Sequence, residues 1–244
     1  MVAHVRIGLI ADIHGNLVAL RTVLTELEHD RVDQTVCLGD LAALGPQPDE
    51  VVSLVRKLGI STVCGNTDGW LVPGHPIPAQ APESEPVHVL TSWASSRITP
   101  QNLDFLRGLP LTLSLHPPGN ASVLCFHGSP ASVDDIITDG NSPGVGEPAE
   151  SILVSGHTHV QEVRRFGDRF YINPGSVGLP GIGPGTPGLP VNRNVAWAEY
   201  AVLEIGEGRI EIILRRIPLA MDLVRDAVIR SGMPYQDWWS GLWA

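Results

Sequence analysis

The sequence predicts an α/β fold built around parallel strands, and three observations support this prediction. First, residues 5–11, 35–38 and 60–64 are apolar runs of the length that buried strands have. Second, the segments between these runs place leucines and valines three and four residues apart, as on one face of a helix. Third, strands and helices alternate, and such βαβ units set consecutive strands parallel.

The two helices of this first half have recognisable limits. Leucines recur through residues 17–27, and Asn16, just before them, is a good N-cap. The second helix is expected over residues 48–58, because Pro48 suits a first helical turn and Gly59 suits a helix end.

The rest of the chain is predicted to alternate regular elements with irregular loops. Residues 70–86 contain many prolines, which we expect to exclude regular structure, and residues 138–150 and 178–190 are loops rich in proline and glycine. Helices are expected at 87–97, 100–107 and 219–231. Single strands are expected at 111–115, 122–126 and 151–155, and hairpins at 160–165 with 169–172 and at 195–205 with 209–214.

Length and composition indicate one domain over residues 1–244, with an aromatic-rich tail at about residues 233–244. The chain is 43% hydrophobic, and no apolar run reaches the roughly 18 residues of a membrane span. The formal charge of −10 argues against a nucleic-acid polymer as a partner, since binding one needs a basic face, but bound cations could still attract a small anion.

Location and assembly are predicted from less direct signals. No signal-like segment precedes the first strand, and the three cysteines form no CxxC pair, so we expect buried free thiols and a cytoplasmic protein. The aromatic tail is expected to dock either on its own domain or on a second subunit, which leaves a homo-oligomer open.

Polar residues follow the predicted strands, at the point where each strand ends. Asp12 and His14 lie two residues apart, so an extended backbone directs both side chains to the same side. Alone, this pair could form a salt bridge, a turn or a metal site. Parallel strands end at one edge of a sheet, where ligands gather. We expect seven side chains to meet there, walled by the loops at 70–86, 138–150 and 173–190: Asp12, His14, Asp40, Asn66, His127, His157 and His159.

These side chains are oxygen and imidazole donors without cysteine. Such donors suit Mn, Fe, Zn, Co or Ni rather than a structural zinc cage. Seven donors exceed the needs of one tetrahedral ion but suit two ions that share a carboxylate. Two metals about 3.5–4 Å apart can hold a hydroxide between them and clamp both ends of an in-line displacement at phosphorus.

The motifs that contain these donors resemble the calcineurin-like metallophosphoesterases over residues 5 to about 215. Their order is Asp12-Ile13-His14, Gly39-Asp40, Gly65-Asn66-Thr67-Asp68, His127-Gly128 and Gly156-His157-Thr158-His159. Four further phrases resemble the small prokaryotic branch of that family: His14-Gly15-Asn16, Gly45-Pro46, His127-Gly128-Ser129-Pro130 and Asn173-Pro174-Gly175-Ser176. That branch contains phosphodiesterases and diadenosine-polyphosphate hydrolases.

The resemblance implies a fold and a division of the donors. The fold would be a four-layer α/β/β/α sandwich with two mixed sheets. One metal would be held by Asp12, His14 and His159, and the other by Asn66, His127 and His157, with Asp40 as the bridge. Two divalent or mixed-valence transition metals are implied, with Mn or Fe favoured.

One position departs from the family. Where the family often has a histidine that acts as an acid, this chain has Thr67, whose hydroxyl can bind a phosphate oxygen but has no proton to give at neutral pH. We therefore assign Asn66 and Thr67 to substrate binding. Asp40 and Asp68 are the predicted catalytic residues; Asp68 would act by orienting its neighbours or by transferring a proton. His75, in the loop over the site, is an alternative proton source.

The resemblance implies a metal-dependent phosphoesterase that hydrolyses small phosphodiesters or nucleotide polyphosphates. A phosphoprotein phosphatase is an alternative within the same class, although it needs an open groove. A non-catalytic scaffold is the alternative from another class, because the fold also resembles the retromer scaffold subunit. A scaffold is free to lose metal ligands, whereas all seven are present here.

Overall fold

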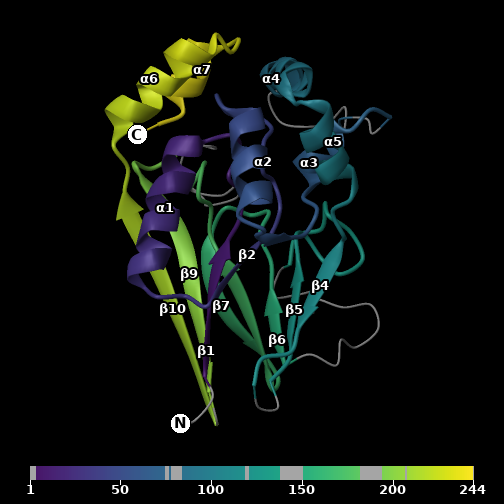
Figure 1. The fold of residues 1–244 in the computed structure, drawn as a ribbon, viewed down its shortest axis with the longest axis vertical. Helices are drawn as coiled ribbons and strands as arrows, with labels where there is room; N and C mark the ends of the chain where they lie inside the picture. Colours follow the sequence, from purple (N-terminus) through teal and green to yellow (C-terminus); the bar gives the residue numbers. More distant parts are fainter. Residues whose placement is uncertain are drawn as a thin grey trace.

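The chain folds into two five-stranded sheets that pack face to face, with helices on one side (Figure 1). The computed structural model describes residues 4–74, 77, 84–118, 121–137, 151–181, 194–206 and 208–243. The first sheet has the order β10 (Arg209–Pro218), β9 (Trp197–Gly206), β1 (Val5–Ile10), β2 (Gln34–Cys37) and β3 (Ser61–Thr62). The second has the order β4 (Thr112–Leu115), β5 (Val123–Phe126), β6 (Ile152–Val154), β8 (Arg169–Pro174) and β7 (Gln161–Phe166).

Each sheet is parallel along one part and antiparallel along another. In the first sheet β1, β2 and β3 are parallel, and the β9–β10 hairpin adds to β1 antiparallel. In the second sheet β5, β6 and β8 are parallel, and β4 and β7 flank them antiparallel. The predicted α/β fold with two mixed sheets is therefore confirmed.

An apolar core fills the space between the sheets. Ile7 and Leu9 of β1 point into it, whereas Ile10 joins the core beneath the helices, as the two-residue period of a strand requires. Val36 and Leu38 contribute from the neighbouring strand region of the first sheet. The second sheet contributes Val123, Cys125, Ile152, Val154 and Ile172. Burial of these side chains fixes the face-to-face packing of the sheets.

Helices cover the outer face of the first sheet. α1 (Leu17–His29) and α2 (Pro48–Lys57) lie over this sheet, α4 (Ser84–Arg97) and α5 (Pro100–Arg107) pack against α2, and α3 (Asn66–Leu71) packs against α4 and α5 (Figure 1). On the outer face of the second sheet Leu124, Leu153 and Tyr171 pack with Ile137, and no helix lies there among the described residues. The loop predicted at 138–150 lies outside the described residues.

Two helices differ from the sequence prediction for the proline-rich stretch. α3 occupies Asn66–Leu71, and α4 already begins at Ser84, so the region without regular structure is shorter than the predicted 70–86. Pro86 is tolerated because it lies in the first turn of α4, where its missing N–H has no helical acceptor. His75 lies outside the described residues.

The chain ends in two helices, α6 (Met221–Ser231) and α7 (Gln236–Gly241), which lie with α4 at the upper end of the molecule in Figure 1. Trp239 of α7 is only 1% exposed and packs with Leu90, Val224 and Val228. The aromatic tail therefore docks on its own chain. No helix in the described part of the chain is long and apolar enough to span a membrane.

Candidate metal centre

The structure brings the seven predicted donors together at the carboxyl ends of the parallel strands. Contacts link them in series: Asp12 to His159, His159 to His14, His14 to Asp40, Asp40 to His127, and His127 to both Asn66 and His157.

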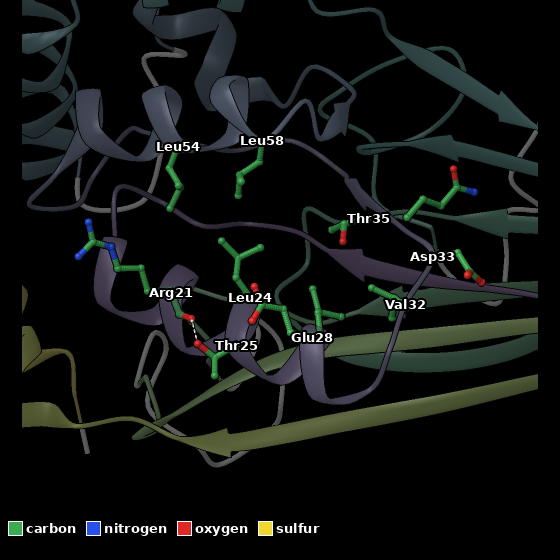
Figure 2. A pocket seen from close by; sticks show the side chains of 11 residues that line it. Arg21, Leu24, Thr25, Glu28, Val32, Asp33, Thr35, Leu54 and Leu58 are labelled. Atoms are coloured by element: carbon green, nitrogen blue, oxygen red, sulfur yellow. Dashed lines mark hydrogen bonds between the residues drawn. The ribbon is translucent and has the colours of Figure 1, made fainter.

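By contrast, a groove of about 560 Å³ lies between α1 and α2, beside the first residues of β2, at the opposite edge (Figure 2). None of the predicted site residues lines that groove.

Asp40 lies between two groups of donors. Its Oδ2 atom is 3.6 Å from His14 Nε2 and 3.5 Å from His127 Nε2. Its other oxygen, Oδ1, accepts a hydrogen bond of 2.9 Å from the backbone N–H of Thr67, which fixes the carboxylate plane. One carboxylate oxygen is therefore directed toward both groups.

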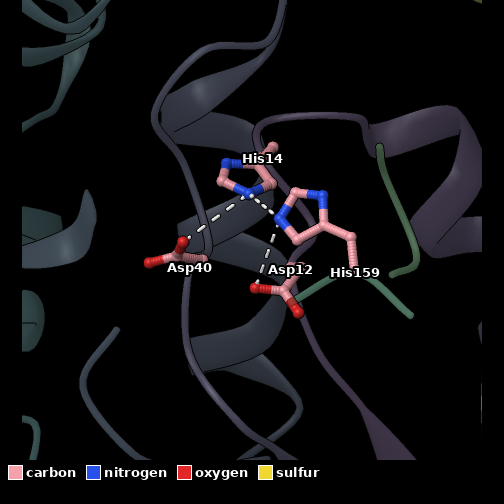
Figure 3. Close-up of side chains that lie close together, drawn as sticks. All are labelled: Asp12, His14, Asp40 and His159. Atoms are coloured by element: carbon pink, nitrogen blue, oxygen red, sulfur yellow. Dashed lines mark hydrogen bonds and ion pairs between the residues drawn. The ribbon is translucent and has the colours of Figure 1, made fainter. Parts of the chain in front are cut away.

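The first group consists of Asp12, His14, Asp40 and His159, with potential ligand atoms that all lie within 4.8 Å of one another (Figure 3). The Nδ1 atoms of His14 and His159 lie 3.1 and 2.8 Å from the carbonyl oxygens of Ala43 and Leu179. Each Nδ1 must carry the proton to make that hydrogen bond, which leaves a lone pair on Nε2 when the ring is neutral.

These two Nε2 atoms are only 3.0 Å apart. Two lone pairs facing each other at this distance repel unless a proton or a cation lies between them. The first donor group therefore fits a metal ion better than it fits a set of neutral side chains.

The second group has the same pattern. His127 Nδ1 lies 2.7 Å from the carbonyl oxygen of Leu38, and His127 Nε2 lies 3.0 Å from Asn66 Oδ1. The rings of His127 and His157 are 5.0 Å apart, and His157 forms a hydrogen bond with the backbone of Asp134. The second group thus also places an imidazole nitrogen and a carbonyl-type oxygen side by side, a donor set that a metal ion can bind once His127 loses its Nε2 proton.

Burial controls the protonation of the donors. It raises the pKa of Asp12 well above its usual range, and it lowers the pKa of His159 to about 3, with His14 beside it acting in the same direction. The His159 imidazole is therefore neutral at physiological pH. Burial opposes charge on Asp40 and His127 too, but their contact prevails: it lowers the pKa of Asp40 and raises that of His127 to about 10.

The backbone at the donors is unusual. Five of the seven have a positive φ: Asp12 (55°), His14 (47°), Asp40 (58°), His157 (72°) and His159 (59°). A non-glycine residue in such a conformation costs about 1–3 kcal/mol, although aspartate and histidine tolerate the left-handed region better than most. These turns follow the strand ends directly, so the chain reverses there while its side chains stay at the edge.

Asp68 lies beneath Asp40 and is fully buried. Its two oxygens accept hydrogen bonds from the backbone N–H groups of Asp40 and Leu41, both at 2.8 Å, and from Gly65 at 3.0 Å. Burial, with Asp40 nearby, raises its pKa to about 7. This arrangement favours the orienting role for Asp68 over direct proton transfer.

Thr67 is only 3% exposed, and its hydroxyl has no hydrogen-bond partner among the described residues. Its backbone N–H donates to Asp40, so the residue is fixed beside the shared carboxylate. The hydroxyl therefore keeps its hydrogen-bonding capacity for another group.

Sequence reasoning missed the residues that support the donors. The carbonyl oxygens of Leu38, Ala43 and Leu179 orient three imidazoles, but a carbonyl acceptor belongs to every residue and gives no signal in the sequence. Ser176 belongs to a phrase that resembles the family but carries no predicted role, yet its Oγ donates to the Asp12 carbonyl oxygen at 2.7 Å and accepts from the Leu179 N–H at 2.9 Å. The start of the loop predicted at 178–190 thus lies at the sheet edge that carries the candidate donors. Residues 182–190 lie outside the described residues.

Two mixed sheets with oxygen and imidazole donors at their strand ends define the class of metallophosphoesterase-like proteins. Residues 5–205 match the calcineurin-like phosphoesterase superfamily domain, and the chain belongs to this superfamily. It is similar to a solved metallophosphoesterase from Sphaerobacter thermophilus, with 25% identity, a TM-score of 0.73, and coverage of 98% of this chain and 99% of that one.

Two further relatives are similar in sequence. An uncharacterized protein of Methanocaldococcus jannaschii is 28% identical over 93% of each chain. A symmetrical bis(5'-nucleosyl)-tetraphosphatase from Hamiltonella defensa is 35% identical over 106 residues, which are 42% of this chain and 38% of that one.

Proposed function

We propose that the chain is a phosphoesterase that uses two transition-metal ions, Mn or Fe being favoured, to hydrolyse small phosphodiesters or nucleotide polyphosphates. The main observation behind this proposal is the Asp40 carboxylate, whose Oδ2 faces the imidazoles of both donor groups. His14 and His159 would hold one ion with Asp12, and His127 and His157 would hold the other with Asn66. The ions, when bound, would supply Lewis-acid activation of water and neutralise charge on the phosphoryl group.

The protein's own side chains would position the substrate. The Thr67 hydroxyl is buried, unpartnered among the described residues and fixed beside Asp40, so it can donate to a phosphoryl oxygen. The amide of Asn66, the preceding residue, offers further N–H donors on the same turn. Bound cations would offset the formal charge of −10 and allow an anionic substrate to approach.

The absence of an imidazole at position 67 bears on the choice of substrate. A threonine hydroxyl cannot protonate a departing alkoxide at neutral pH, and a positioned acid is commonly worth roughly 10²–10⁴ in rate. Phenolates and the phosphate groups of an anhydride depart without that help. The partial similarity to a bis(5'-nucleosyl)-tetraphosphatase, which acts on such anhydrides by its name, supports this substrate class.

Metal analysis of the purified protein, followed by a substrate panel, tests the proposal. We expect two metal equivalents per chain, and faster hydrolysis of bis(4-nitrophenyl) phosphate and diadenosine tetraphosphate than of a phosphoserine peptide. A preference for the peptide would support the phosphoprotein phosphatase instead. Bound metal without hydrolysis of any substrate would support the non-catalytic scaffold, and absence of metal would contradict the proposal.

A further inference from the structure

The C-terminal part of the chain lies beyond residues 5–205, which match the superfamily, yet it packs at the metal end of the sheets. α6 and α7 sit there beside α4 (Figure 1). Their buried residues Val224, Val228 and Trp239 form one apolar cluster with Leu90 and Leu179. Leu179 is the residue whose carbonyl oxygen orients His159, so this cluster reaches the residues around the metal centre.

The orientation of the His159 ring depends on the position of the Leu179 backbone. His159 Nδ1 lies 2.8 Å from the Leu179 carbonyl oxygen. The Leu179 N–H donates to Ser176 Oγ, and the Leu179 side chain is 7% exposed within the apolar cluster. A shift of this backbone would therefore turn the Nε2 atom of His159 away from His14 and Asp12.

Main-chain pairing connects the same backbone to the C-terminal residues. Next to Leu179, the Pro180 carbonyl oxygen accepts a hydrogen bond of 2.9 Å from the Val195 N–H. The Asn194 N–H in turn donates to the Leu242 carbonyl oxygen at 2.7 Å. Asn194 bridges to Gly181 on one side and to Trp243 on the other, so three short segments pair edge to edge.

Apolar packing of Trp239 and Trp243 stabilises this pairing. The rings of Trp239 and Trp243 lie 5.4 Å apart, and both belong to the cluster that contains Leu179. Neither indole N–H has a hydrogen-bond partner within the described part of the chain. The rings therefore act through apolar packing, which a phenylalanine can largely reproduce.

We propose that the C-terminal segment is a positioning element of the metal centre, in which Trp243 holds the 179–181 backbone in register and thereby orients His159. The inference rests on the metal-dependent function proposed above. Trp243 would act on the centre through Asn194, with which it pairs, and through Leu179, which lies in the same apolar cluster. Partners that orient a metal ligand typically contribute 10- to 100-fold, roughly, to metal affinity.

The test is titration of the metal-free protein with Mn²⁺ by calorimetry, for wild type, Trp243→Ala, Trp243→Phe and Leu179→Ala. Leu179→Ala keeps the carbonyl oxygen but removes the side chain that anchors it. Leu27→Ala is the matched control, because it removes a buried apolar side chain from α1, away from this cluster. Co²⁺ absorption spectra of each variant report the coordination at the centre independently of activity.

We expect Trp243→Ala and Leu179→Ala to weaken one of the two Mn²⁺ sites by roughly 10- to 100-fold and leave the other unchanged. Trp243→Phe should restore most of the affinity, and Leu27→Ala should bind as wild type does. Wild-type affinity at both sites in folded Trp243→Ala and Leu179→Ala would overturn the inference. Equal weakening in Leu27→Ala would also overturn it, because the effect would then follow stability alone. Absence of metal from the wild type would instead contradict the proposed function.

Discussion

The Nε2 atoms of His14 and His159 lie 3.0 Å apart, although the Nδ1 atom of each ring already lies within hydrogen-bonding distance of a backbone carbonyl oxygen. In each neutral ring the Nδ1 proton is donated to a backbone carbonyl oxygen, so the lone pairs of the two Nε2 atoms face each other. This arrangement is unfavourable for two neutral imidazoles, because lone pairs at this distance repel each other. A cation bound between the two Nε2 atoms would remove this repulsion.

Asp40→Asn should remove the charge that both donor groups share while preserving the shape of the side chain. We expect loss of at least one metal ion and a fall in turnover of several orders of magnitude, with the fold retained. Metal analysis, circular dichroism and turnover measure these three properties. Asp237→Asn, the same change at an exposed position of α7, is the control. Full activity with two bound metals in Asp40→Asn would refute the bridging role.

Gly65→Ala should displace the Asp40 carboxylate, because the added methyl group needs the space that Asp40 occupies. A Cβ at position 65 would overlap both the Asp40 carboxylate and the Asp40 backbone nitrogen. We expect a loss of about 1–3 kcal/mol in unfolding free energy, together with lower metal content. Gly69→Ala, four residues later in α3, meets nothing within 4 Å and should leave both quantities unchanged or raise the stability slightly. Similar behaviour of the two variants in urea unfolding would contradict this view of Gly65.

Thr67 should make the rate depend on the leaving group. In a series of aryl phosphodiesters at saturating metal, we expect the wild-type rate to fall steeply as the leaving-group pKa rises. Thr67→His should flatten this dependence, because an imidazolium can protonate the departing oxygen. Thr67→Val replaces the hydroxyl with a methyl group of similar size and should raise KM without changing the slope. A flat wild-type dependence would assign the proton to another residue, such as Asp68 or His75.

Metal binding should release the proton of His127. The pKa of this imidazole is about 10 in the metal-free protein, because Asp40 holds the proton against the effect of burial. A metal ion must displace that proton, so affinity should rise about tenfold per pH unit through neutral pH. Mn²⁺ titrations in buffers of different ionisation enthalpy measure the released proton directly. Affinity that does not change with pH would show that His127 is neutral before binding.

The same shift predicts how the metal-free protein responds to pH. The folded pKa of His127 lies above its ordinary value of 6.5, so the ion pair with Asp40 stabilises the fold fully below that value. The contribution is lost as the pH rises toward 10. Urea unfolding of metal-free protein should therefore show falling stability across this range, and His127→Gln should reduce this slope.

The clustering of the seven candidate side chains could be predicted from the sequence, because side-chain type and strand direction both mark them. Asp12, Asp40 and His127 each follow an apolar run, and the parallel pairing of β1 with β2 and of β5 with β6 brings such positions to one edge. The packing of the two sheets on each other left no comparable signal in the sequence and was expected only from the resemblance, and the fourth, helical layer that the resemblance implied is not seen among the described residues.

Other features could not be predicted for identifiable reasons. The helix α3 was missed because Gly65 and three polar residues are typical of a loop; in the structure the Asp68 carboxylate accepts from the Gly65 N–H and caps the helix start. The packing of the C-terminal residues beside residues 179–181 could not be predicted, because it depends on main-chain pairing between Asn194 and residues 242–243. Every residue except proline can form such backbone hydrogen bonds, so the amino-acid types do not reveal which distant segments pair.

The use of carbonyl oxygens as the partners of His14, His127 and His159 has a genetic consequence. A codon change can delete a metal donor outright, but it cannot delete a main-chain acceptor; it can only displace one. Mutations that abolish metal binding in a single step should therefore map to the donors themselves. Mutations in the surrounding shell should form a graded series, with residual binding set by how far each one moves the chain.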